Sequence, residues 1–556
     1  MDVNNVRYNH PTPWDTRFEA MTLPEMFRRA TDRQSDAPLL HFLGRGYSYR
    51  ELYTEAQQFA SALIERGIAK GDRIGLFLPN VPIYVAAYYG AMMAGAVVVN
   101  FSPLYTPREL SEQVADSGTR LLVTVDVPQL YATAVQVLAG SDLQTLVVGE
   151  LAAMLPVAKR IAMKLFARGQ IARVKSGENV LRWQELISVG RARREIAIDP
   201  SDTALLQYTG GTTGTPKGAM LSHANLSINA QQVCAINPFG EPEKEVFMGA
   251  LPFFHVFANT ALLNHAVASG AAIAMVPRFK AKQVLATMEK QGATGFPGVP
   301  TMFQALLDHP NLEKTDLSSL KVCISGGAPL SAPLREKWEA RTGVRLVEGY
   351  GLTESSGVVS ANPYDGMRKP GTIGQVVAGT EVILLDKEDP AKLAPAGEPG
   401  ELAIHGPQIM QGYWNRPEAS QQVFIERDGK RWLRTGDVAT IDADGFIEIV
   451  DRIKDMIAVG GFKVFPGEVE KVLLQHPAIK EALVLGLPDD YTGEKPHGFV
   501  TLEGGDAIDD GKILEWANAR LGKHERLASL TIRDSLPQTL VGKLDRKALR
   551  AEVLPA

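Results

Sequence analysis

Short strands in which nearly every residue is apolar alternate with amphipathic helices through the first third of the chain. Ser48 with Glu51 has the form of a capping box, apolar residues follow at helical spacing, and an apolar strand comes next at 74–78. Thr106 with Glu109 begins another helix in the same way. Helices that alternate with such strands predict parallel sheets covered on both faces.

The alternation resumes later in the chain and then changes character. Residues 271–276 and 321–325 predict strands between helices, whereas from about residue 375 short alternating strands are separated by turns. These later strands are expected at 382–385, 401–405 and 446–450. A helix at 467–475 and a strand at 482–487 begin a compact α+β tail.

This change of pattern predicts an α/β protein of two domains. A large N-terminal domain at 1–453 would contain two doubly wound α/β subdomains and a small β-subdomain. A small α+β domain would follow at 454–556. With 556 residues, 45% of them hydrophobic, the chain is long enough to bury more than one core.

Composition narrows the class of protein. The formal net charge is −5, so the chain has no excess of basic residues and nucleic acid is not expected as a partner. Two cysteines, Cys234 and Cys323, have no Cys-x-x-Cys spacing, which argues against a zinc site and suits a reducing cytoplasm. The polar N-terminus lacks a signal-peptide core, so a cytoplasmic location is expected.

Two segments bear on membranes. Residues 81–99 carry no charge, but Pro82 and two glycines interrupt them, so we expect a buried helix and strand. Residues 155–175 are basic and amphipathic, and two interpretations stay open: a solvated helix over the core, or a peripheral contact with the inner face of an anionic membrane. A homodimer also stays open. The basic residues are Lys159, Arg160, Lys164, Arg168, Arg173 and Lys175.

A loop rich in glycine and threonine ends on one lysine. Glycine lets the backbone approach an anion, threonine hydroxyls donate hydrogen bonds, and Lys217 adds a mobile positive charge, so the loop predicts polyphosphate binding with ATP as the first candidate. Pro216 before the lysine and Gly218 after it exclude a Walker A motif. The loop residues are Thr209, Gly210, Gly211, Thr212, Thr213, Gly214, Thr215 and Lys217.

Two further clusters have the same character. The first follows the strand at 321–325, where small residues leave backbone groups free for a ligand. In the second, Tyr350 provides a plane that can stack on a base and Glu354 a carboxylate of the kind that binds Mg²⁺. The members are Gly326, Gly327 and Ala328, and Glu348, Gly349, Tyr350, Gly351, Thr353 and Glu354.

Together with Asp437 and the late Gly542-Lys543 pair, these motifs stand in an order that resembles the adenylate-forming (ANL) superfamily of acyl-CoA synthetases. The resemblance runs from about residue 39 to residue 550. Segments 251–258, 362–365 and 406–417 resemble bacterial long-chain fatty-acyl-CoA synthetases most.

The resemblance implies a role for each motif. The loop would hold the β- and γ-phosphates, with Lys217 on the leaving pyrophosphate, and Thr209 and Glu354 would hold Mg²⁺. Gly326, Gly327, Ala328 and Tyr350 would frame the adenine, and Glu348, Gly349 and Gly351 belong to the same nucleotide site. Thr353 would contact the α-phosphate, Asp437 the ribose, and Arg452 the ribose or phosphate. Lys543 would bridge the reacting carboxylate and the α-phosphate.

Two more sites follow from the same resemblance. Lys454 would be the hinge on which the small α+β C-terminal domain moves. Gly460, Gly461 and Phe462 would line the CoA tunnel in the thioester-forming state. The acyl pocket would be formed by His255, Phe254, Phe257, Phe296, Gly298 and Val299. Asn259 stands where some relatives carry a tryptophan gate, and Lys463 and Phe465 stand where close relatives often carry Asn and Tyr.

The expected function is therefore an ATP- and Mg²⁺-dependent acid:CoA ligase for medium- or long-chain fatty acids. The acid would attack the α-phosphorus, release pyrophosphate and form an acyl-adenylate that CoA converts to a thioester. Two alternatives stay open at this point: a ligase for dicarboxylic or aromatic acids, and an acyl-AMP ligase that loads a carrier protein.

Overall fold

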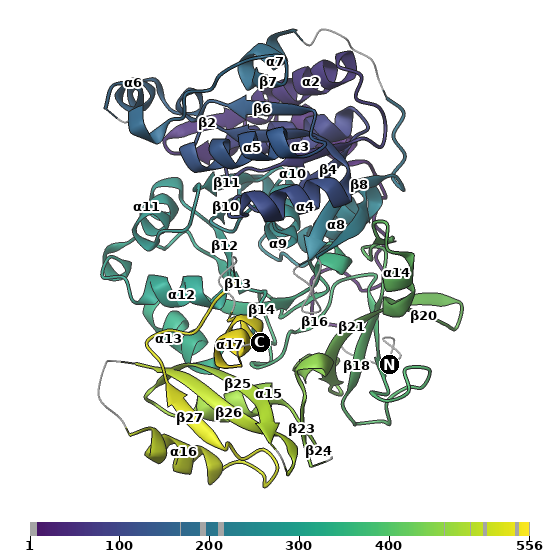
Figure 1. Cartoon of the computed structure of the whole chain (residues 1–556), viewed down its shortest axis with the longest axis vertical. Coiled ribbons are helices and arrows are strands. Elements are labelled where there is room, and N and C mark those ends of the chain that lie inside the picture. Colours follow the sequence, from purple (N-terminus) through teal and green to yellow (C-terminus); the bar gives the residue numbers. More distant parts are fainter. Residues whose placement is uncertain are drawn as a thin grey trace.

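The computed structural model describes residues 8–166, 168–189, 196–209, 216–460, 462–489, 491–503, 509–539 and 544–554. The large N-terminal part lies above a smaller C-terminal unit, with a β-subdomain beside them on the right (Figure 1). This arrangement confirms the α/β class.

The first sheet has eight strands in the order β19-β9-β8-β4-β3-β5-β6-β7. From β8 to β7 neighbouring strands are parallel, and β9 and β19 extend the β8 edge antiparallel. Its strands are β3 (Arg73–Leu76), β4 (Val97–Asn100), β5 (Thr119–Val125), β6 (Thr145–Gly149), β7 (Val180–Arg182), β8 (Thr203–Thr209), β9 (Lys217–Ser222) and β19 (Gly412–Tyr413).

The second sheet has nine strands in the order β16-β15-β14-β13-β12-β10-β11-β1-β2, with a parallel centre from β14 to β1. Its strands are β1 (Pro38–Phe42), β2 (Arg45–Ser48), β10 (Val246–Gly249), β11 (Ala272–Met275), β12 (Gly295–Gly298), β13 (Val322–Ser325), β14 (Leu346–Tyr350), β15 (Ser360–Ala361) and β16 (Gln375–Val376). The strands expected at 271–276 and 321–325 are therefore confirmed within one residue at each end.

Helices cover both sheets because their apolar faces must be buried. Those of the N-terminal part are α1 (Leu23–Gln34), α2 (Tyr49–Glu65), α3 (Pro82–Met93), α4 (Pro107–Ser117), α5 (Pro128–Gly140), α6 (Val157–Phe166), α7 (Trp183–Val189), α8 (His223–Ala235), α9 (Val256–Ala258), α10 (His265–Ser269), α11 (Ala281–Gln291), α12 (Pro300–Leu307) and α13 (Ala332–Thr342). A π-helix, Asn259–Asn264, joins α9 to α10.

The β-subdomain and the C-terminal unit each contain a five-stranded sheet. The former has β17 (Glu381–Leu385), β18 (Gly400–His405), β20 (Phe424–Arg427), β21 (Lys430–Ile441) and β22 (Ile447–Arg452), with α14 (Pro417–Val423). The latter has β23 (Ile457–Val459), β24 (Phe462–Val464), β25 (Ile479–Asp489), β26 (Gly493–Leu502) and β27 (Ser529–Ile532), with α15 (Pro466–Leu473), α16 (Asp510–Asn518) and α17 (Arg546–Val553).

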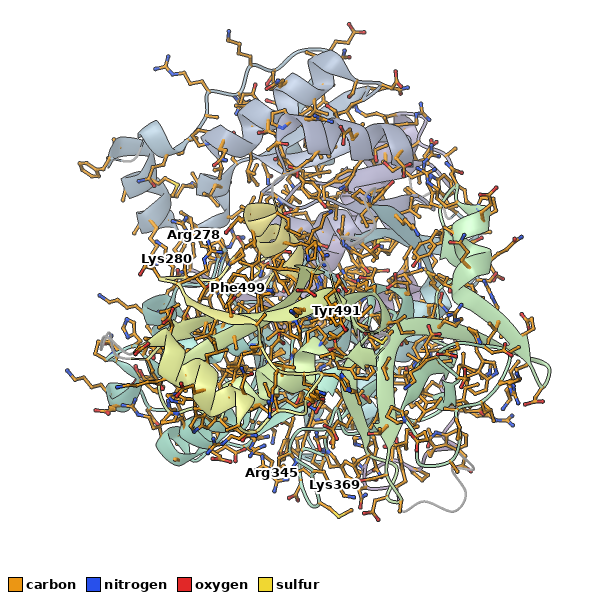
Figure 2. The ribbon with its side chains drawn as sticks, turned by 60° about the horizontal axis from the view of Figure 1, so that its bottom comes forward. Arg278, Lys280, Arg345, Lys369, Tyr491 and Phe499 are labelled. Carbon is orange, nitrogen blue, oxygen red and sulfur yellow. The ribbon has the colours of Figure 1, made fainter. Side chains whose placement is uncertain are left out.

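Figure 2 brings the C-terminal unit forward. Phe499 of β26 is buried in that unit, whereas Tyr491, in the turn before β26, is 95% exposed. Among the described residues, three ion pairs link this unit to the rest of the chain, and their side chains are all more than a third exposed, so each contributes at most about 1 kcal/mol. They are Lys471 with Glu448 at 2.6 Å, Lys337 with Glu503 at 2.5 Å and Lys480 with Asp308 at 3.3 Å.

The two expected capping boxes have different outcomes. The box of Thr106 and Glu109 is complete at the start of α4. Ser48 caps α2 through the backbone N–H of Glu51, but the Glu51 carboxylate pairs with Arg45 instead of returning to the cap. The second box is therefore half formed, because an arginine on β2 competes for the carboxylate.

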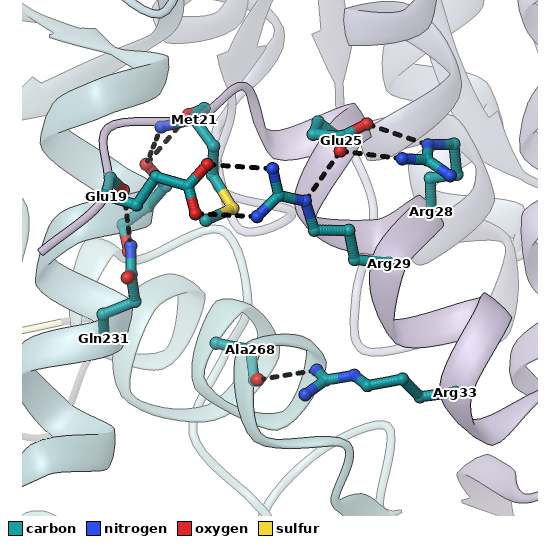
Figure 3. A network of polar contacts seen from close by, with 9 residues as sticks. Glu19, Met21, Glu25, Arg28, Arg29, Arg33, Gln231 and Ala268 are labelled. Atoms are coloured by element: carbon teal, nitrogen blue, oxygen red, sulfur yellow. Dashed lines mark hydrogen bonds and ion pairs between the residues drawn. The ribbon is translucent and has the colours of Figure 1, made fainter.

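The N-terminal segment is fastened to the large domain by arginines of α1 (Figure 3). Arg29 donates to both carboxylate oxygens of Glu19 at 2.7 and 2.8 Å, and Gln231 of α8 donates to the Glu19 carbonyl at 2.8 Å. Arg33 donates to the carbonyl of Ala268 in α10. These exposed contacts orient α1, while its buried face, which includes Phe27, stabilises the docking.

The uncharged segment 81–99 forms α3 and β4, and nearly all of it is buried, as expected. Within the described parts of the chain, no helix combines the length and apolarity needed to cross a bilayer. Gly90 of α3 lets that helix approach α2 closely, because a Cβ there would lie 2.6 Å from the carbonyl oxygen of Ala56.

We predict that Gly90→Ala destabilises the protein by about 2 kcal/mol, although alanine is the better helix former, because the added methyl collides with backbone. Gly140→Ala, at the end of α5 where nothing lies within 4 Å, is the matched control and should be neutral or slightly stabilising. Thermal or denaturant unfolding of both variants measures the difference. Equal stabilities would contradict the close approach of α2 and α3.

Candidate active site

A cavity of about 2120 Å³ is lined by residues of both parallel sheets, the β-subdomain and the C-terminal unit. The carboxyl ends of β8, β13 and β14 open into it, as ligand sites of open α/β sheets do. Residues of α15, β25 and α17 line the opposite side. Four separate pieces of the chain therefore build one site.

The glycine- and threonine-rich loop joins β8 to β9 at the edge of this cavity. Thr209 and Lys217 face each other across the hairpin and both line the cavity. Residues 210–215, Gly210, Gly211, Thr212, Thr213, Gly214 and Thr215, lie outside the described residues. Tyr208 anchors the β8–β9 hairpin, because its hydroxyl donates to Asp116 at 2.6 Å.

Tyr413 connects the two charged groups of the loop region, and sequence reasoning missed it. Its hydroxyl donates to the Glu354 carboxylate at 2.7 Å, and its ring lies 5.2 Å from the Lys217 ammonium. Burial and the Glu354 charge raise the pKa of Tyr413, so it remains a proton donor. Tyr413 lies on the short strand β19, nearly 200 residues after the loop. No pattern in the residues around it predicts that it contacts the loop region.

Asp437 is the centre of a buried polar cluster in the cavity. Its side chain is 3% exposed; one carboxylate oxygen accepts from the Tyr350 hydroxyl at 2.5 Å and the other from Arg452 Nε at 2.8 Å. Asp437 and Arg452 face each other on β21 and β22. The Asp437 charge raises the pKa of Arg452, so this guanidinium stays protonated.

The backbone beside this cluster is closely packed. A Cβ on Gly326 would lie 2.9 Å from the Phe257 ring, and one on Gly351 would lie 2.0 Å from the carbonyl oxygen of Gly357. Gly327 has φ +80°, which favours glycine. These residues line the cavity together with Ala328, Glu348, Gly349, Tyr350 and Thr353.

The C-terminal unit presents one of its two expected functional segments to the cavity. Lys454 lines it, and burial and the neighbouring Arg452 lower the pKa of this lysine. Lys543 lies outside the described residues, but Thr539 and Leu544 on either side of that gap both line the cavity. The residues that flank Lys543 therefore reach the cavity.

The second segment lies elsewhere. Gly460 is an exposed turn residue between β23 and β24 whose N–H donates to the Thr492 carbonyl at 2.8 Å, and it does not line the cavity. Gly461 lies outside the described residues, as does the side chain of Phe462. The structure thus brings the flanks of Lys543 to the site and leaves Gly460 away from it.

The acyl-pocket prediction needs a correction. His255, Phe254 and Phe257 line the cavity, with His255 capping α9. Phe296 and Gly298 do not, because side chains alternate along β12 and the cavity face belongs to Gly295 and Pro297. Phe296 packs on the other face against Phe303, with ring centroids 5.0 Å apart, and Val299 is buried outside the cavity wall.

Packing also determines where the side chain points at the position of the tryptophan gate, which is Asn259 in this chain. Asn259 is fully buried and does not line the cavity. Its side-chain oxygen accepts from the Tyr88 hydroxyl at 2.9 Å and from Asn264 at 3.1 Å. At this position the side chain points into the domain core, away from the cavity.

Beyond His255 the cavity continues as an apolar channel across the face of the second sheet. Side chains of α8 and its C-cap, the π-helix and β13 line it: Val233, Ile236, Ala261, Val322 and Ile324. Most of them belong to one buried apolar cluster. Sequence reasoning missed these residues, because nothing local distinguishes a channel wall from an ordinary core.

The fold and this cavity define a nucleotide-binding α/β enzyme whose small C-terminal unit completes the site. The chain belongs to the AMP-binding enzyme family: the model of the AMP-binding enzyme matches residues 27–414, and that of the AMP-binding enzyme C-terminal domain matches residues 468–543. The resemblance to adenylate-forming acyl-CoA synthetases is confirmed. A long-chain-fatty-acid–CoA ligase from Bacillus subtilis (strain 168) is 37% identical over 556 residues, 98% of this chain and 97% of the relative.

Solved structures agree with this assignment. ATP-bound MatB from Rhodopseudomonas palustris is 29% identical, with 96% of this chain and 99% of that chain covered, and superposes with a TM-score of 0.82. The apo form of the same protein, at the same coverage, superposes with a TM-score of 0.74. The present chain is thus more similar to the ATP-bound arrangement.

Glu348, at the cavity wall, generates a test of the site's electrostatics. Burial raises its pKa from 4.5 to about 8, although the Leu330 N–H donates to its carboxylate at 3.1 Å. Between these two pH values the folded protein holds a proton that the unfolded chain has released, so stability falls as pH rises through this window.

We predict that Glu348→Gln removes most of this fall, so that melting temperatures at pH 5 and pH 8 differ less in the variant than in the wild type. Glu515→Gln, at an exposed position of α16, is the control and should retain the wild-type profile. An unchanged profile in Glu348→Gln would show that the carboxyl is ionised at neutral pH.

Proposed function

We propose that the protein is an ATP-dependent acid:CoA ligase that adenylates a medium- or long-chain fatty acid, releases pyrophosphate and transfers the acyl group to CoA. One observation supports this best: a single cavity joins the polar cluster of Asp437, Tyr350 and Arg452 to an apolar channel. Such a cavity suits a ligand with a polar nucleotide at one end and a hydrocarbon at the other.

The two-step chemistry explains why these groups converge. A carboxylate is a poor acyl donor, whereas an acyl-adenylate accepts a thiol readily. Negative charge accumulates around the α-phosphorus during the first step, and Lys543 with the loop donors would neutralise it. Lys217 would serve the leaving pyrophosphate, Thr353 the α-phosphate, and Asp437 the ribose hydroxyls in place of its present Tyr350 contact.

Mg²⁺ fits the donor set at the loop. In the described ranges no three His, Cys, Asp or Glu side chains gather to enclose a metal by themselves. Glu354 supplies one carboxylate and Thr209 one hydroxyl at the cavity edge, and phosphate oxygens would complete the shell that Mg²⁺ prefers. When bound, the ion would offset charge on the phosphates.

A rearrangement of the C-terminal unit would serve the second step. We take the boundary between the 1–453 and 454–556 domains as the hinge, at Lys454, and the exposed ion pairs across the interface oppose movement only weakly. Rotation there would withdraw the Lys543 tail and bring Gly460, Gly461 and Phe462 to the cavity to receive CoA.

We predict that Lys543→Ala lowers the rate of acyl-adenylate formation by about 10²- to 10³-fold, because it removes a donor aimed at developing charge. Thioester formation from supplied acyl-adenylate and CoA should persist. Lys512→Ala on α16 is the control. Pyrophosphate release and CoA thioester are measured over a panel of straight-chain, dicarboxylic and aromatic acids.

Activity confined to aromatic or dicarboxylic acids would replace the fatty-acid assignment. Adenylate without a CoA-dependent thioester would indicate a ligase that loads a carrier protein. Unchanged adenylation in Lys543→Ala would remove the role given to that lysine.

Peripheral membrane contact is a separate proposal. Helix α6 projects from the upper left of the N-terminal part (Figure 1), with Val157, Ile161 and Leu165 at 65%, 53% and 56% exposure and Phe166 at 87%. A helix that merely covered the core would turn these residues inward. Exposed apolar residues beside basic ones suit an anionic lipid surface.

We predict that the protein sediments with anionic vesicles at low salt, and that Ile161→Glu with Phe166→Glu abolishes this. Neutralising Lys159 and Arg160 should weaken binding about tenfold or more, since each basic residue near such a surface contributes about 1 kcal/mol. Leu393→Glu, which changes an exposed leucine of the β-subdomain, is the control. No sedimentation of the wild type would end the proposal.

A further inference from the structure

Two charged residues lie at the far end of the acyl channel. Glu245, directly before β10, lines the cavity and is only 2% exposed. It forms an ion pair with Lys321, directly before β13, whose side chain is 37% exposed. The Lys321 ammonium also lies 5.7 Å from the centre of the Phe239 ring. This pair sits at the edge of the sheet opposite to the nucleotide site.

The distance between the two ends follows from strand geometry. The channel runs along β13, with Ile324 and Val322 on its wall, from Gly326 at the nucleotide end to the level of Lys321. Five residues at about 3.3 Å each span about 16 Å. An extended hydrocarbon, whose bonds of about 1.5 Å zigzag, fits roughly a dozen carbons into that length.

Apart from the pair, the described residues that line this end, such as Phe239, Phe247 and Val322, carry no charge. His265 stacks on Phe247 with ring centroids 4.5 Å apart, and burial lowers its pKa to about 4, so it is neutral at pH 7. The Thr294 hydroxyl is used by the backbone of Val246. A carboxylate arriving here would meet the Glu245 carboxylate, which is only 2% exposed and already paired with Lys321, and two like charges this close are costly.

We propose that the Glu245–Lys321 ion pair is the end wall of the acyl channel. This wall sets the longest acyl chain that the channel accepts without displacing the pair, and it rejects acids that carry a second, terminal carboxylate. This rests on the proposed function and narrows its substrate. Lys321 is exposed enough to remain solvated if Glu245 is removed, so the wall can be opened by one substitution.

The test compares kcat/KM for octadecanoic and decanoic acids. Glu245→Ala should raise the ratio of the two about tenfold or more, in line with what a few methylenes are worth in an apolar pocket. Ala261→Phe, which narrows the channel at the π-helix, should lower the ratio by a similar factor while decanoic acid is still activated. Decanedioic acid should be a poor substrate of the wild type and a better one of Glu245→Ala.

The matched control is Glu241→Gln, four residues earlier, which breaks an exposed ion pair with Lys244 at 2.6 Å and should leave the ratio unchanged. An unchanged ratio in a folded Glu245→Ala would overturn the end-wall assignment. An unchanged ratio in Ala261→Phe would overturn the route of the channel, whether or not Glu245→Ala folds. A wild type that activates no fatty acid at all would instead refute the proposed function.

Discussion

A buried carboxylate must be paired, and the pairing of Asp437 determines how the parts of this molecule meet. Its partners come from two places: Tyr350 ends β14 of the second parallel sheet, and Arg452 ends β22 of the β-subdomain. Arg452 is also the last strand residue before Lys454. The same cluster thus joins sheet to subdomain and fixes the point from which the C-terminal unit departs.

This arrangement explains why the cavity has one polar end and one apolar end. Carboxyl ends of parallel strands leave backbone groups and glycines free, so the polar end forms where β8, β13 and β14 terminate. The face of the second sheet that α8 and the π-helix cover must be apolar, so the hydrocarbon end of the cavity lies along β12 and β13. The nucleotide site and the acyl site are neighbours because the ends of these strands lie next to the apolar face of the second sheet.

The C-terminal unit is held differently. It has its own apolar core, and its ion pairs to the large domain are exposed. Weak, screened contacts allow one small unit to present the Lys543 tail and, after rotation, the Gly460 turn. Similarity to the ATP-bound form of MatB, greater than to its apo form, agrees with the first of these arrangements.

The sequence by itself determined what depends on neighbours a few residues apart. Apolar spacing defined the strands and helices, the Thr106–Glu109 box defined a helix start, and the loop ending at Lys217 defined a polyphosphate-binding class. The order of motifs then supported the family. Tertiary structure alone decided which side of β12 faces the cavity, which excludes Phe296, and which distant residues meet, as Tyr413 meets Glu354 and Glu245 meets Lys321. Such contacts join residues far apart in the chain, and they depend on strand order and register, which local patterns do not encode.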